Sequence, residues 1–222
     1  MVKSVAPSSS IEEYLENIYR LQERDGVART KKLAEMMNVT LGTITNTIES
    51  LERRRFVKHL PYKGVRLTKE GEKIAIDVIR RHRLVERLLT DILRMEWSRV
   101  HEVACKLEHG FTEELVMLIG KSLGYPKTCP HGNPIPTRKG SMVKDKSRPL
   151  ASLRPADEGR IVKIVEESSS LLKFLSGQGL VIGAIVRIKH IARSGNSDFI
   201  LLEGVEHPLE IEIGRKIWVN KI

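Results

Sequence analysis

The stretch "TKKLAEMMNVTLGTITNTIESLER", Thr30 to Arg53, decides the fold that we predict for the N-terminal part of this chain. Its first half predicts a short helix that Thr30 caps and that ends near Met37. The "NVT" that follows predicts a tight turn, and Thr40 is the expected cap of a second helix that runs to about Arg53. Two short helices joined by such a turn are typical of a helix-turn-helix.

The flanking sequence extends this unit to a winged helix. After the second helix, "FVKHL" and "VRLT" predict two short strands around "PYKG", a turn sequence with Pro and Gly. N-terminal to the helix-turn-helix, "SSSIEEYLENIYRLQER" predicts an amphipathic helix that begins with serine caps and is the first helix of the chain. Its apolar face consists of Ile11, Leu15, Ile18 and Leu21.

The charge of the chain gathers in the same region. The 222 residues carry a net charge of +10, and residues 20–69, with 12 Lys or Arg and 5 Asp or Glu, contribute +7 of it. Such a balance favours a polyanionic partner, which we take to be nucleic acid rather than an anionic membrane surface. Because "MVKSVAPSSS" lacks the apolar core of a signal peptide and no apolar run reaches the length of a membrane span, we expect a cytoplasmic protein that does not bind membranes.

The remaining two thirds divide into a helical and a β-rich part. From Glu70 to Gly124 the apolar spacing is helical, with Thr112 as a cap and Gly124 as a stop. Residues 126–155 hold six of the nine prolines, which indicates a linker. Beyond it, five short β-branched runs predict a small barrel or sandwich.

One helical stretch, "VHEVACKLEHG" at Val100 to Gly110, places four possible metal ligands side by side. Positions i, i+4, i+7 and i+8 share a helix face, and here they are His101, Cys105, Glu108 and His109. Each residue by itself is more typical of a structural role. The four together favour a metal site. In a reducing cytosol we expect Cys105 and Cys129 to be thiols available to a metal rather than a disulfide.

Four segments of the chain together match the pattern of a known family. They are "EEYLENIYRL" at Glu12 to Leu21, "RRHRLVERLLTDIL" at Arg80 to Leu93, "VHEVACKLEH" at Val100 to His109 and "CPHGNPIP" at Cys129 to Pro136. With them, the chain resembles the diphtheria toxin repressor and iron-dependent regulator family of metal-activated transcriptional repressors over essentially its whole length. The C-terminal strands, through "GLVIGAIVRI", resemble the family's Src-homology-3-like barrel, which is similar to FeoA, a small protein of ferrous-iron transport.

The resemblance implies a mainly α chain with a C-terminal all-β domain. The expected parts are a winged-helix DNA-binding domain (1–73), a helical metal-binding and dimerisation domain (74–140), a linker (141–156) and a Src-homology-3-like FeoA-type domain (157–222). It also implies a homodimer that represses metal homeostasis genes from a pseudo-palindromic operator on double-stranded DNA. We expect no enzyme and no small organic substrate, since no nucleophile, base and oxyanion arrangement stands out.

Two metal sites follow from the resemblance. The first consists of His82, Glu86 and His101, and the second of Cys105, Glu108 and His109. The iron-responding branch adds a methionine from the first helix where this chain has Glu13. Manganese-responding relatives have a carboxylate there and at the position of Cys105. Glu16 is a further possible ligand, because it has a counterpart in the manganese-responding branch. We therefore expect Fe(II), with Mn(II) as the alternative and Zn(II), Co(II) or Ni(II) as substitutes in vitro.

Other candidate ligands are assigned less directly. The barrel of the family can supply acidic or amide ligands, but the best-matching positions here are Ser168 and Leu171, which cannot serve well. Glu166 and Glu167 are close in sequence, and we assign neither. We give "CPHG", with Cys129 and His131, a loop-packing role, because two cysteines more than twenty residues apart disfavour a closed structural zinc site.

The resemblance also places DNA contacts on the winged helix. It assigns base-facing positions to Thr40, Gly42, Thr43 and Asn46, whereas Arg29, Thr45 and Lys63 are better placed for phosphates. We assign Leu41, Ile44 and Ile48 to the core, with contact to a thymine methyl group as the alternative.

Three other functions remain open from the sequence. One is a manganese-responsive regulator of the same family. A second is an iron-handling accessory protein that uses the FeoA-like barrel, against which the winged helix and its charge argue. The third is a winged-helix regulator that senses an organic ligand without metal. DNA retardation with and without Fe(II) separates the accessory protein from a metal-dependent regulator, and titration of DNA binding metal by metal addresses the choice between iron and manganese.

Overall fold

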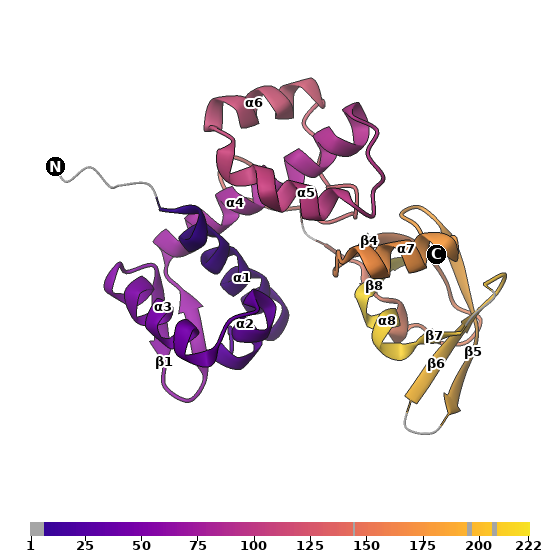
Figure 1. Cartoon of the computed structure of the whole chain (residues 1–222). Coiled ribbons are helices and arrows are strands. Elements are labelled where there is room, and N and C mark those ends of the chain that lie inside the picture. Colours follow the sequence, from indigo (N-terminus) through magenta and orange to yellow (C-terminus); the bar gives the residue numbers. More distant parts are fainter. Residues whose placement is uncertain (1–6, 144, 195–196, 206–207) are drawn as a thin grey trace. The chain divides into compact units, whose positions relative to one another are not determined.

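The computed structural model describes residues 7–143, 145–194, 197–205 and 208–222 (Figure 1). The chain forms two compact units, which we describe separately. The first comprises the described residues up to Arg81 together with Pro136–Ser141, and the second comprises His82–Ile135 and the described residues from Met142 to Ile222. None of the helices in these described stretches is both long enough and apolar enough to cross a membrane.

The first unit is the predicted winged helix. Its elements are α1 (Ser9–Asp25), α2 (Thr30–Met37), α3 (Leu41–Arg53), the antiparallel strands β1 (Val57–Leu60) and β2 (Gly64–Leu67), and the first part of α4 (Lys69–Arg87). Asn38, with φ 51°, ends α2 in the left-handed region, and the side chain of Thr40 accepts from the Thr43 amide (3.2 Å), as predicted for the cap of α3. The predicted cap at Thr30 is wrong, because Thr30 is already the first residue of α2.

Apolar side chains form the core of this unit. Fully or almost fully buried are Leu15, Ile18 and Leu21 of α1, Leu33 of α2, Ile44, Ile48 and Leu51 of α3, and Val57 and Val65 of the hairpin. The core assignment of Leu41 is wrong, since its side chain is 55% exposed. Gly64, with φ 127°, lies so close to Ala28 that a Cβ would stand 2.3 Å from its carbonyl oxygen, so glycine is required where the wing meets the helices.

The second unit begins with helices. They are the remainder of α4, the π-helical turn η1 (Leu88–Ile92), α5 (Val100–Leu107), the 3-10 turn η2 (Glu108–Gly110) and α6 (Glu113–Ser122), whose cap is Thr112 as predicted. The expectation of one continuous helical stripe from His101 to His109 is wrong. The α-helix ends at Leu107, because Gly110 follows and Phe111 is extended, so Glu108 and His109 lie in the tighter turn.

The rest of the second unit is the predicted β-rich domain. Its elements are β3 (Arg148–Pro149), η3 (Leu150–Ser152), β4 (Glu158–Ile164), α7 (Ser169–Gly177), β5 (Ile185–Ser194), β6 (Ser197–Leu202), β7 (Leu209–Glu210), α8 (Ile211–Lys216) and β8 (Ile217–Lys221). The sheet order is β3-β8-β4-β5-β6-β7, with antiparallel pairs. Leu150 and Leu153, which we assigned to the linker, are buried in the core of this domain.

Two expectations for this domain differ from the structure. The barrel does not close among the described residues, since β3 and β7, each two residues long, stand at opposite ends of the sheet order. The run "PLEIEI" gives only the short β7 before α8 begins at Ile211. The helix α7 was not predicted at all, although Leu171, Leu172 and Leu175 bury one of its faces.

Candidate metal centre

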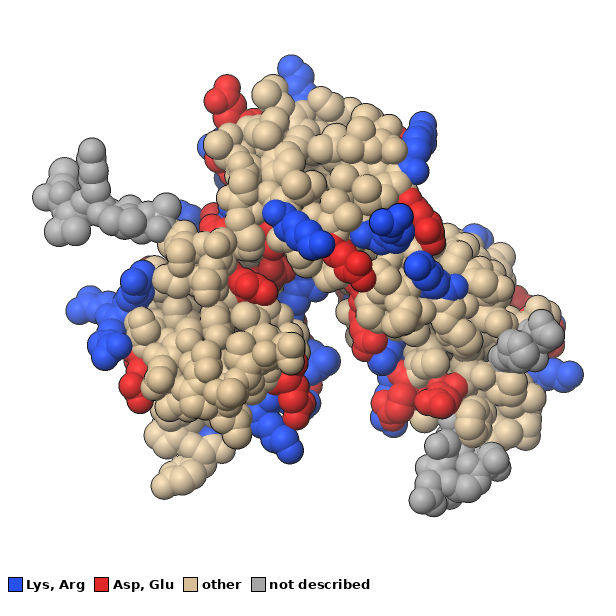
Figure 2. Space-filling model, viewed as in Figure 1, with Lys and Arg blue, Asp and Glu red and all other residues tan. Residues whose placement is uncertain are grey.

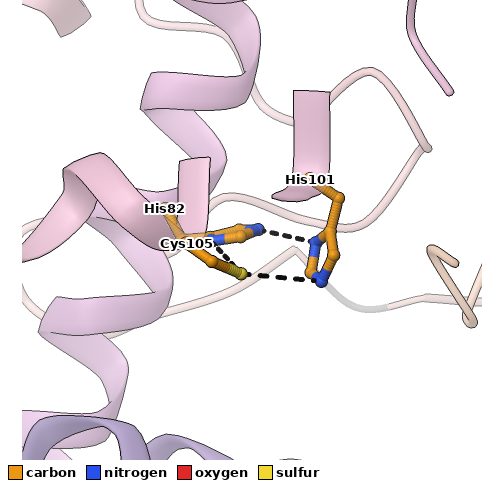
Figure 3. A group of neighbouring side chains, drawn as sticks. All are labelled: His82, His101 and Cys105. Carbon is orange, nitrogen blue, oxygen red and sulfur yellow. Dashed lines mark hydrogen bonds between the residues drawn. The ribbon is translucent and has the colours of Figure 1, made fainter. Parts of the chain in front are cut away.

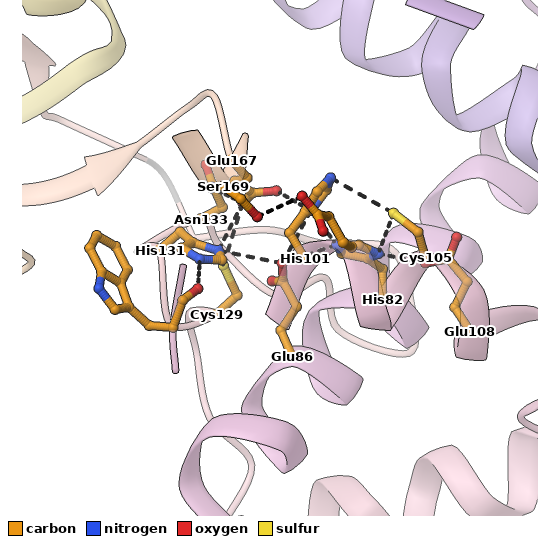
Figure 4. Close-up of polar contacts among 12 residues, drawn as sticks. His82, Glu86, His101, Cys105, Glu108, Cys129, His131, Asn133, Glu167 and Ser169 are labelled. Carbon is orange, nitrogen blue, oxygen red and sulfur yellow. Dashed lines mark hydrogen bonds and ion pairs between the residues drawn. The ribbon is translucent and has the colours of Figure 1, made fainter. Parts of the chain in front are cut away.

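Three of the predicted ligands meet at one point of the second unit (Figure 4). His82 and Glu86, one turn apart on α4, have 0% exposure, and His101 reaches them from α5. The Nε2 atom of His82 lies 3.1 Å from Glu86 Oε1 and 3.0 Å from His101 Nδ1, which is itself 3.3 Å from the same carboxylate oxygen. The structure therefore brings together the whole first predicted set.

A fourth side chain comes from the β-rich domain. Glu167, in the segment between β4 and α7, is 6% exposed, and its Oε2 atom lies 2.9 Å from His101 Nδ1. The amide of Asn133 donates to its other carboxylate oxygen (2.6 Å) and to the Ile164 carbonyl (2.9 Å). Glu167, to which we assigned no role from the sequence, is thus held in the cluster from two sides.

The "CPHG" loop brings two more donor atoms to the same carboxylates. Cys129 and His131 are buried, and His131 Nδ1 lies 3.4 Å from Glu86 Oε1 and 3.5 Å from Glu167 Oε1. His131 Nε2 donates to the Trp97 carbonyl (2.8 Å), an arrangement that leaves Nδ1 to face the carboxylates. The role of this loop therefore extends beyond the packing that we predicted.

Two groups of possible ligands result, and they share two members. One is His82, Glu86, His101 and Glu167, and the other is Glu86, Cys129, His131 and Glu167. Within each group the ligand atoms all lie within 4.8 Å of one another. The two carboxylates stand between a pair of imidazoles on one side and a thiol with an imidazole on the other.

Cys105 lies beside the first group rather than apart from it (Figure 3). Its Sγ atom is 3.7 Å from His101 Nε2 and 4.0 Å from His82 Nδ1, and these three residues form a further possible ligand group. His82 Nδ1 also donates to Glu108 Oε2 (2.6 Å), and Glu108 Oε1 lies 3.4 Å from His109 Nε2. The two sites implied by the resemblance are therefore linked through His82.

Burial and charge perturb the protonation of this cluster. Burial would lower the pKa of His101, but hydrogen bonds with Cys105 and two carboxylates raise it from its usual 6.5 to about 11. Burial likewise opposes the charge of His82, yet the charge of Glu86 raises the pKa of His82 well above its usual value. Burial raises the pKa of the Cys129 thiol to about 11. In the absence of a metal ion, the carboxylate charges are balanced by protons on the imidazoles.

The donor set fits a divalent metal ion. Ligand atoms about 2.1 Å from one ion and at right angles lie about 3.0 Å apart, which is close to the spacing of the atoms from His82, Glu86 and His101. Among the described residues, Glu86 Oε2 is buried without a hydrogen-bond partner, so this carboxylate oxygen is available to bind a metal ion. Imidazole, carboxylate and thiol together suit first-row divalent metals.

The other candidate ligands lie elsewhere. Glu13 and Glu16 belong to α1 in the first unit, where the Glu16 carboxylate pairs with Arg20 (2.7 Å), so their part in the second site stays a prediction. Glu166 pairs with Lys216 (2.8 Å). Ser168 occupies the cap position of α7 and Leu171 is buried in the β-rich core, in line with our exclusion of both as ligands.

The predicted DNA contacts all lie on the surface of the winged helix. They are Arg29, Thr40, Gly42, Thr43, Thr45, Asn46 and Lys63, and each is exposed. A cleft of about 770 Å³ between the start of α2 and the wing is lined by Arg29, Lys31, Lys63 and Arg66. Figure 2 shows Lys and Arg side chains projecting from this unit, with some Asp and Glu between them, around a mainly uncharged surface. Such a surface suits a polyanion.

Comparison with known families gives three matches along the chain. The family described as "Iron dependent repressor, N-terminal DNA binding domain" matches residues 7–65. "Iron dependent repressor, metal binding and dimerisation domain" matches residues 68–137, which include most of the cluster. "FeoA domain" matches residues 148–221.

Individual proteins match over nearly the full length. The diphtheria toxin repressor of Corynebacterium glutamicum is 30% identical over 216 residues, which are 90% of this chain and 95% of the relative. A solved structure of a manganese-dependent transcriptional repressor in complex with manganese has a TM-score of 0.83 and 29% identity over 96% of this chain and 100% of that one. The crystal structure of T. acidophilum IdeR has a TM-score of 0.78 and 30% identity, with 99% of each chain covered.

Proposed function

Since the chain belongs to the iron-dependent repressor family, we propose that it binds its operator as a homodimer when the cluster around Glu86 holds divalent metal. Members of this family are metal-dependent transcriptional repressors, so this protein is a repressor and not an enzyme. The match to the FeoA domain accounts for the β-rich part without requiring an accessory role in iron transport.

The observation that carries the proposal is the sharing of Glu86 and Glu167 by two ligand groups. We propose that the cluster accommodates two ions, with His82 and His101 on one side and Cys129 and His131 on the other. A bound divalent ion supplies positive charge that allows both carboxylates to stay ionised beside neutral imidazoles. With metal bound, neutral imidazoles and the carboxylates would hold the ions, and these side chains would connect α4, α5, the "CPHG" loop and the β-rich domain.

The link to the winged helix is α4 itself. His82 and Glu86 lie on its C-terminal part, whereas Ala75, Val78 and Ile79 of its first part are buried in the first unit. In that unit Arg81 also donates to Glu12 of α1 (2.6 Å). Because one continuous helix carries both sets of contacts, ordering its ligand-bearing end restricts the position of the winged helix.

We retain the second predicted site as part of the proposal. Cys105, Glu108 and His109, with Glu13 and Glu16 from α1, would give a metal-dependent connection between the first helix and the second unit. The proposed physiological metal is Fe(II), for which the Cys105 thiolate is a soft ligand, with Mn(II) as the alternative. Burial would raise the pKa of Cys105, but the facing His101 and His82 lower it, which favours the thiolate.

The dimer is proposed to form through an apolar surface of the helical part. The large apolar side chains exposed on this part are Ile92, Leu93, Leu107, Leu115, Met117, Leu118 and Tyr125. A second copy of this chain is the proposed occupant, in keeping with the dimerisation domain that the matching family describes. The two copies of α3 would then enter successive major grooves of a pseudo-palindromic operator.

The test measures metal content and DNA binding together, anaerobically, with Fe(II) and Mn(II) in parallel. Fluorescence anisotropy on genomic fragments should show DNA binding only with metal. Glu86→Gln should weaken this metal-dependent DNA binding by about 100-fold or more. The matched control is Glu210→Gln, which removes the same charge from an exposed position of β7.

Metal analysis then tests the two ions. His131→Ala should retain fewer ions per chain than the unsubstituted protein, whereas Glu210→Gln should retain the same number. Full-strength DNA binding by the metal-free protein would contradict the proposed switch, and an unchanged ion count in His131→Ala would contradict the second ion.

A further inference from the structure

The start of α7 meets α5 at a second point, beside the cluster of candidate ligands (Figure 4). Ser169 is the first residue of α7, and its Oγ atom donates to the Ser98 carbonyl oxygen (2.8 Å) and to Glu102 Oε1 (2.6 Å). A hydroxyl has one hydrogen, which these two acceptors share. Neither Ser169 nor Glu102 belongs to the possible ligand groups found among the described residues.

Each of these side chains would have an ordinary explanation by itself. A serine at the start of a helix commonly bonds to a backbone amide of its own first turn. An acid in the first turn of a helix, such as Glu102 in α5, interacts favourably with the helix dipole. Here, however, the Ser169 hydroxyl leaves its own helix and bonds to a different one. The contact therefore joins two elements instead of capping one.

This contact stands next to the one through which Glu167 enters the cluster. Glu167 precedes α7, and Ser168 between it and Ser169 has an extended backbone (φ −66°, ψ 135°). Glu167 Oε2 lies 2.9 Å from His101 Nδ1, and Ser169 contacts the following residue of α5, Glu102. Two neighbouring side chains of one segment thus meet two successive residues of α5.

The two contacts differ in how a metal ion affects them. Glu167 and His101 are both candidate ligands, so their direct contact must rearrange when an ion comes between them. Ser169 bonds to a backbone carbonyl and to a side chain outside the ligand groups, so metal binding leaves these bonds in place. They can hold the start of α7 against α5 before any ion arrives.

We propose that Ser169 and Glu102 are positioning residues of the metal centre, which keep Glu167 within reach of His101 in the metal-free protein. The inference rests on the proposed metal centre and deepens it. Without such an anchor, metal binding would also have to order the segment that carries Glu167, at a cost in conformational entropy. With it, the carboxylate is preorganised and metal affinity rises. The hydroxyl acts on metal affinity without touching the ion.

The experiment measures the Mn(II) affinity of the full-length protein by anaerobic calorimetric titration without DNA. Ser169→Ala should weaken Mn(II) binding by about tenfold, the lower end of the loss that follows removal of an outer partner of a metal ligand. Ser170→Ala removes an exposed hydroxyl from the same turn of α7 and should keep the affinity.

The α5 side of the contact gives a second pair of variants. Glu102→Ala should weaken Mn(II) binding to a smaller extent than Ser169→Ala, because the Ser98 carbonyl still accepts from Ser169. Glu102→Gln retains an oxygen acceptor for the hydroxyl and should keep the affinity of the unsubstituted protein. This pair tests the inference even if Ser169→Ala does not fold.

A double-mutant cycle tests whether Ser169 acts through Glu167. If it does, Ser169→Ala should cause no further loss of Mn(II) affinity in a Glu167→Ala background. A merely structural serine would cause the same loss in both backgrounds. Hydrogen exchange of the metal-free protein gives a separate measurement. The Leu172 amide, which donates to the Ser168 carbonyl (3.0 Å), should exchange faster in Ser169→Ala than in the unsubstituted protein.

The outcomes separate this inference from the proposed function. If the unsubstituted protein binds no Mn(II), or if Glu86→Gln binds it equally well, the proposed centre fails and the inference with it. If Glu86→Gln loses Mn(II) binding and Ser169→Ala keeps it, the centre stands and the inference is overturned. An unchanged affinity in Glu167→Ala, or equal losses from Ser169→Ala in both backgrounds, overturns the inference as well.

Discussion

The two units of the molecule place their polar side chains in opposite ways. Of the buried polar or charged side chains in the described part of the chain, Glu16 lies in the winged-helix unit. The other eight lie in the second unit: His82, Glu86, Ser98, Glu108, His131, Asn133, Ser147 and Glu167. The unit that reads DNA thus has an apolar core and carries its charge outside, whereas the unit that responds to metal carries charge inside.

This difference separates a constant part from a responsive part. Burial of apolar side chains stabilises the winged helix regardless of metal. Buried carboxylates and imidazoles are costly unless they are paired, and here either protons or a metal ion can balance them. We therefore expect metal and pH to act on the second unit and changes in DNA reading to act on the first.

The largest expected effect is on the second unit when metal is added. At a metal concentration about 1,000 times the Kd, its free energy of unfolding should rise by about 4 kcal/mol, because metal binds the folded cluster and not the unfolded chain. Hydrogen exchange measures the two units separately. Metal should increase the protection of backbone amides in α5 and the "CPHG" loop, with little change in α3. An equal gain in α3 would break the comparison.

The reverse case is a substitution that affects DNA reading and leaves the metal unit untouched. Asn46→Ala should cost about 1–3 kcal/mol at the operator, since Asn46 is exposed on α3 at a base-facing position. Metal affinity, measured by titration without DNA, should stay unchanged, as should binding to non-specific duplex. Equal losses on both DNAs would reject base reading by this residue.

The protonation of the cluster gives a pH dependence that metal should suppress. Because the pKa of His101 is raised from 6.5 to about 11, its protonated form stabilises the metal-free fold below pH 6.5, and this contribution is lost as the pH rises toward 11. Between pH 7 and 9 the free energy of unfolding should fall by at most about 1.4 kcal/mol per pH unit for each such imidazole.

Urea unfolding of the second unit at pH 7, 8 and 9, with and without metal, measures this dependence. Metal-bound imidazoles are neutral throughout, so the loaded protein should show a smaller slope. As a control, the exposed His59 of the wing can be replaced by Asn, which should leave the slope as it is. A stability that stays nearly constant over this range would show that the imidazoles are neutral in the metal-free fold.

The smallest expected effect concerns the choice between metals. Cys105→Glu replaces a soft thiolate by a hard carboxylate, so it should lower the Mn(II) concentration that activates DNA binding. The ratio of the Fe(II) to the Mn(II) concentration at half-maximal DNA binding should shift by less than about tenfold. Anaerobic anisotropy titrations with each metal measure both midpoints. An unchanged ratio would mean that Cys105 does not select the metal.

Elements with a local signal were predictable from the sequence. The turn residues and the Thr40 cap define the helix-turn-helix, and helical spacing together with the family resemblance gave His82, Glu86 and His101. Prediction failed where the local pattern was ambiguous. The β-branched run before Ile217 forms the short helix α8, because tertiary contacts override its weak strand propensity. The helical stripe of α5 ends before Glu108, because a glycine follows closely at position 110.

The sequence by itself determined the winged helix, the location of its positive charge and the helix-borne ligands, since each depends on residues close together in the chain. Only the tertiary structure decided the rest of the centre. Cys129, His131 and Glu167 come from a loop and an interstrand segment, and no periodicity relates them to α4. They become candidate ligands only because folding brings these distant segments around Glu86, where burial makes their mutual positions specific.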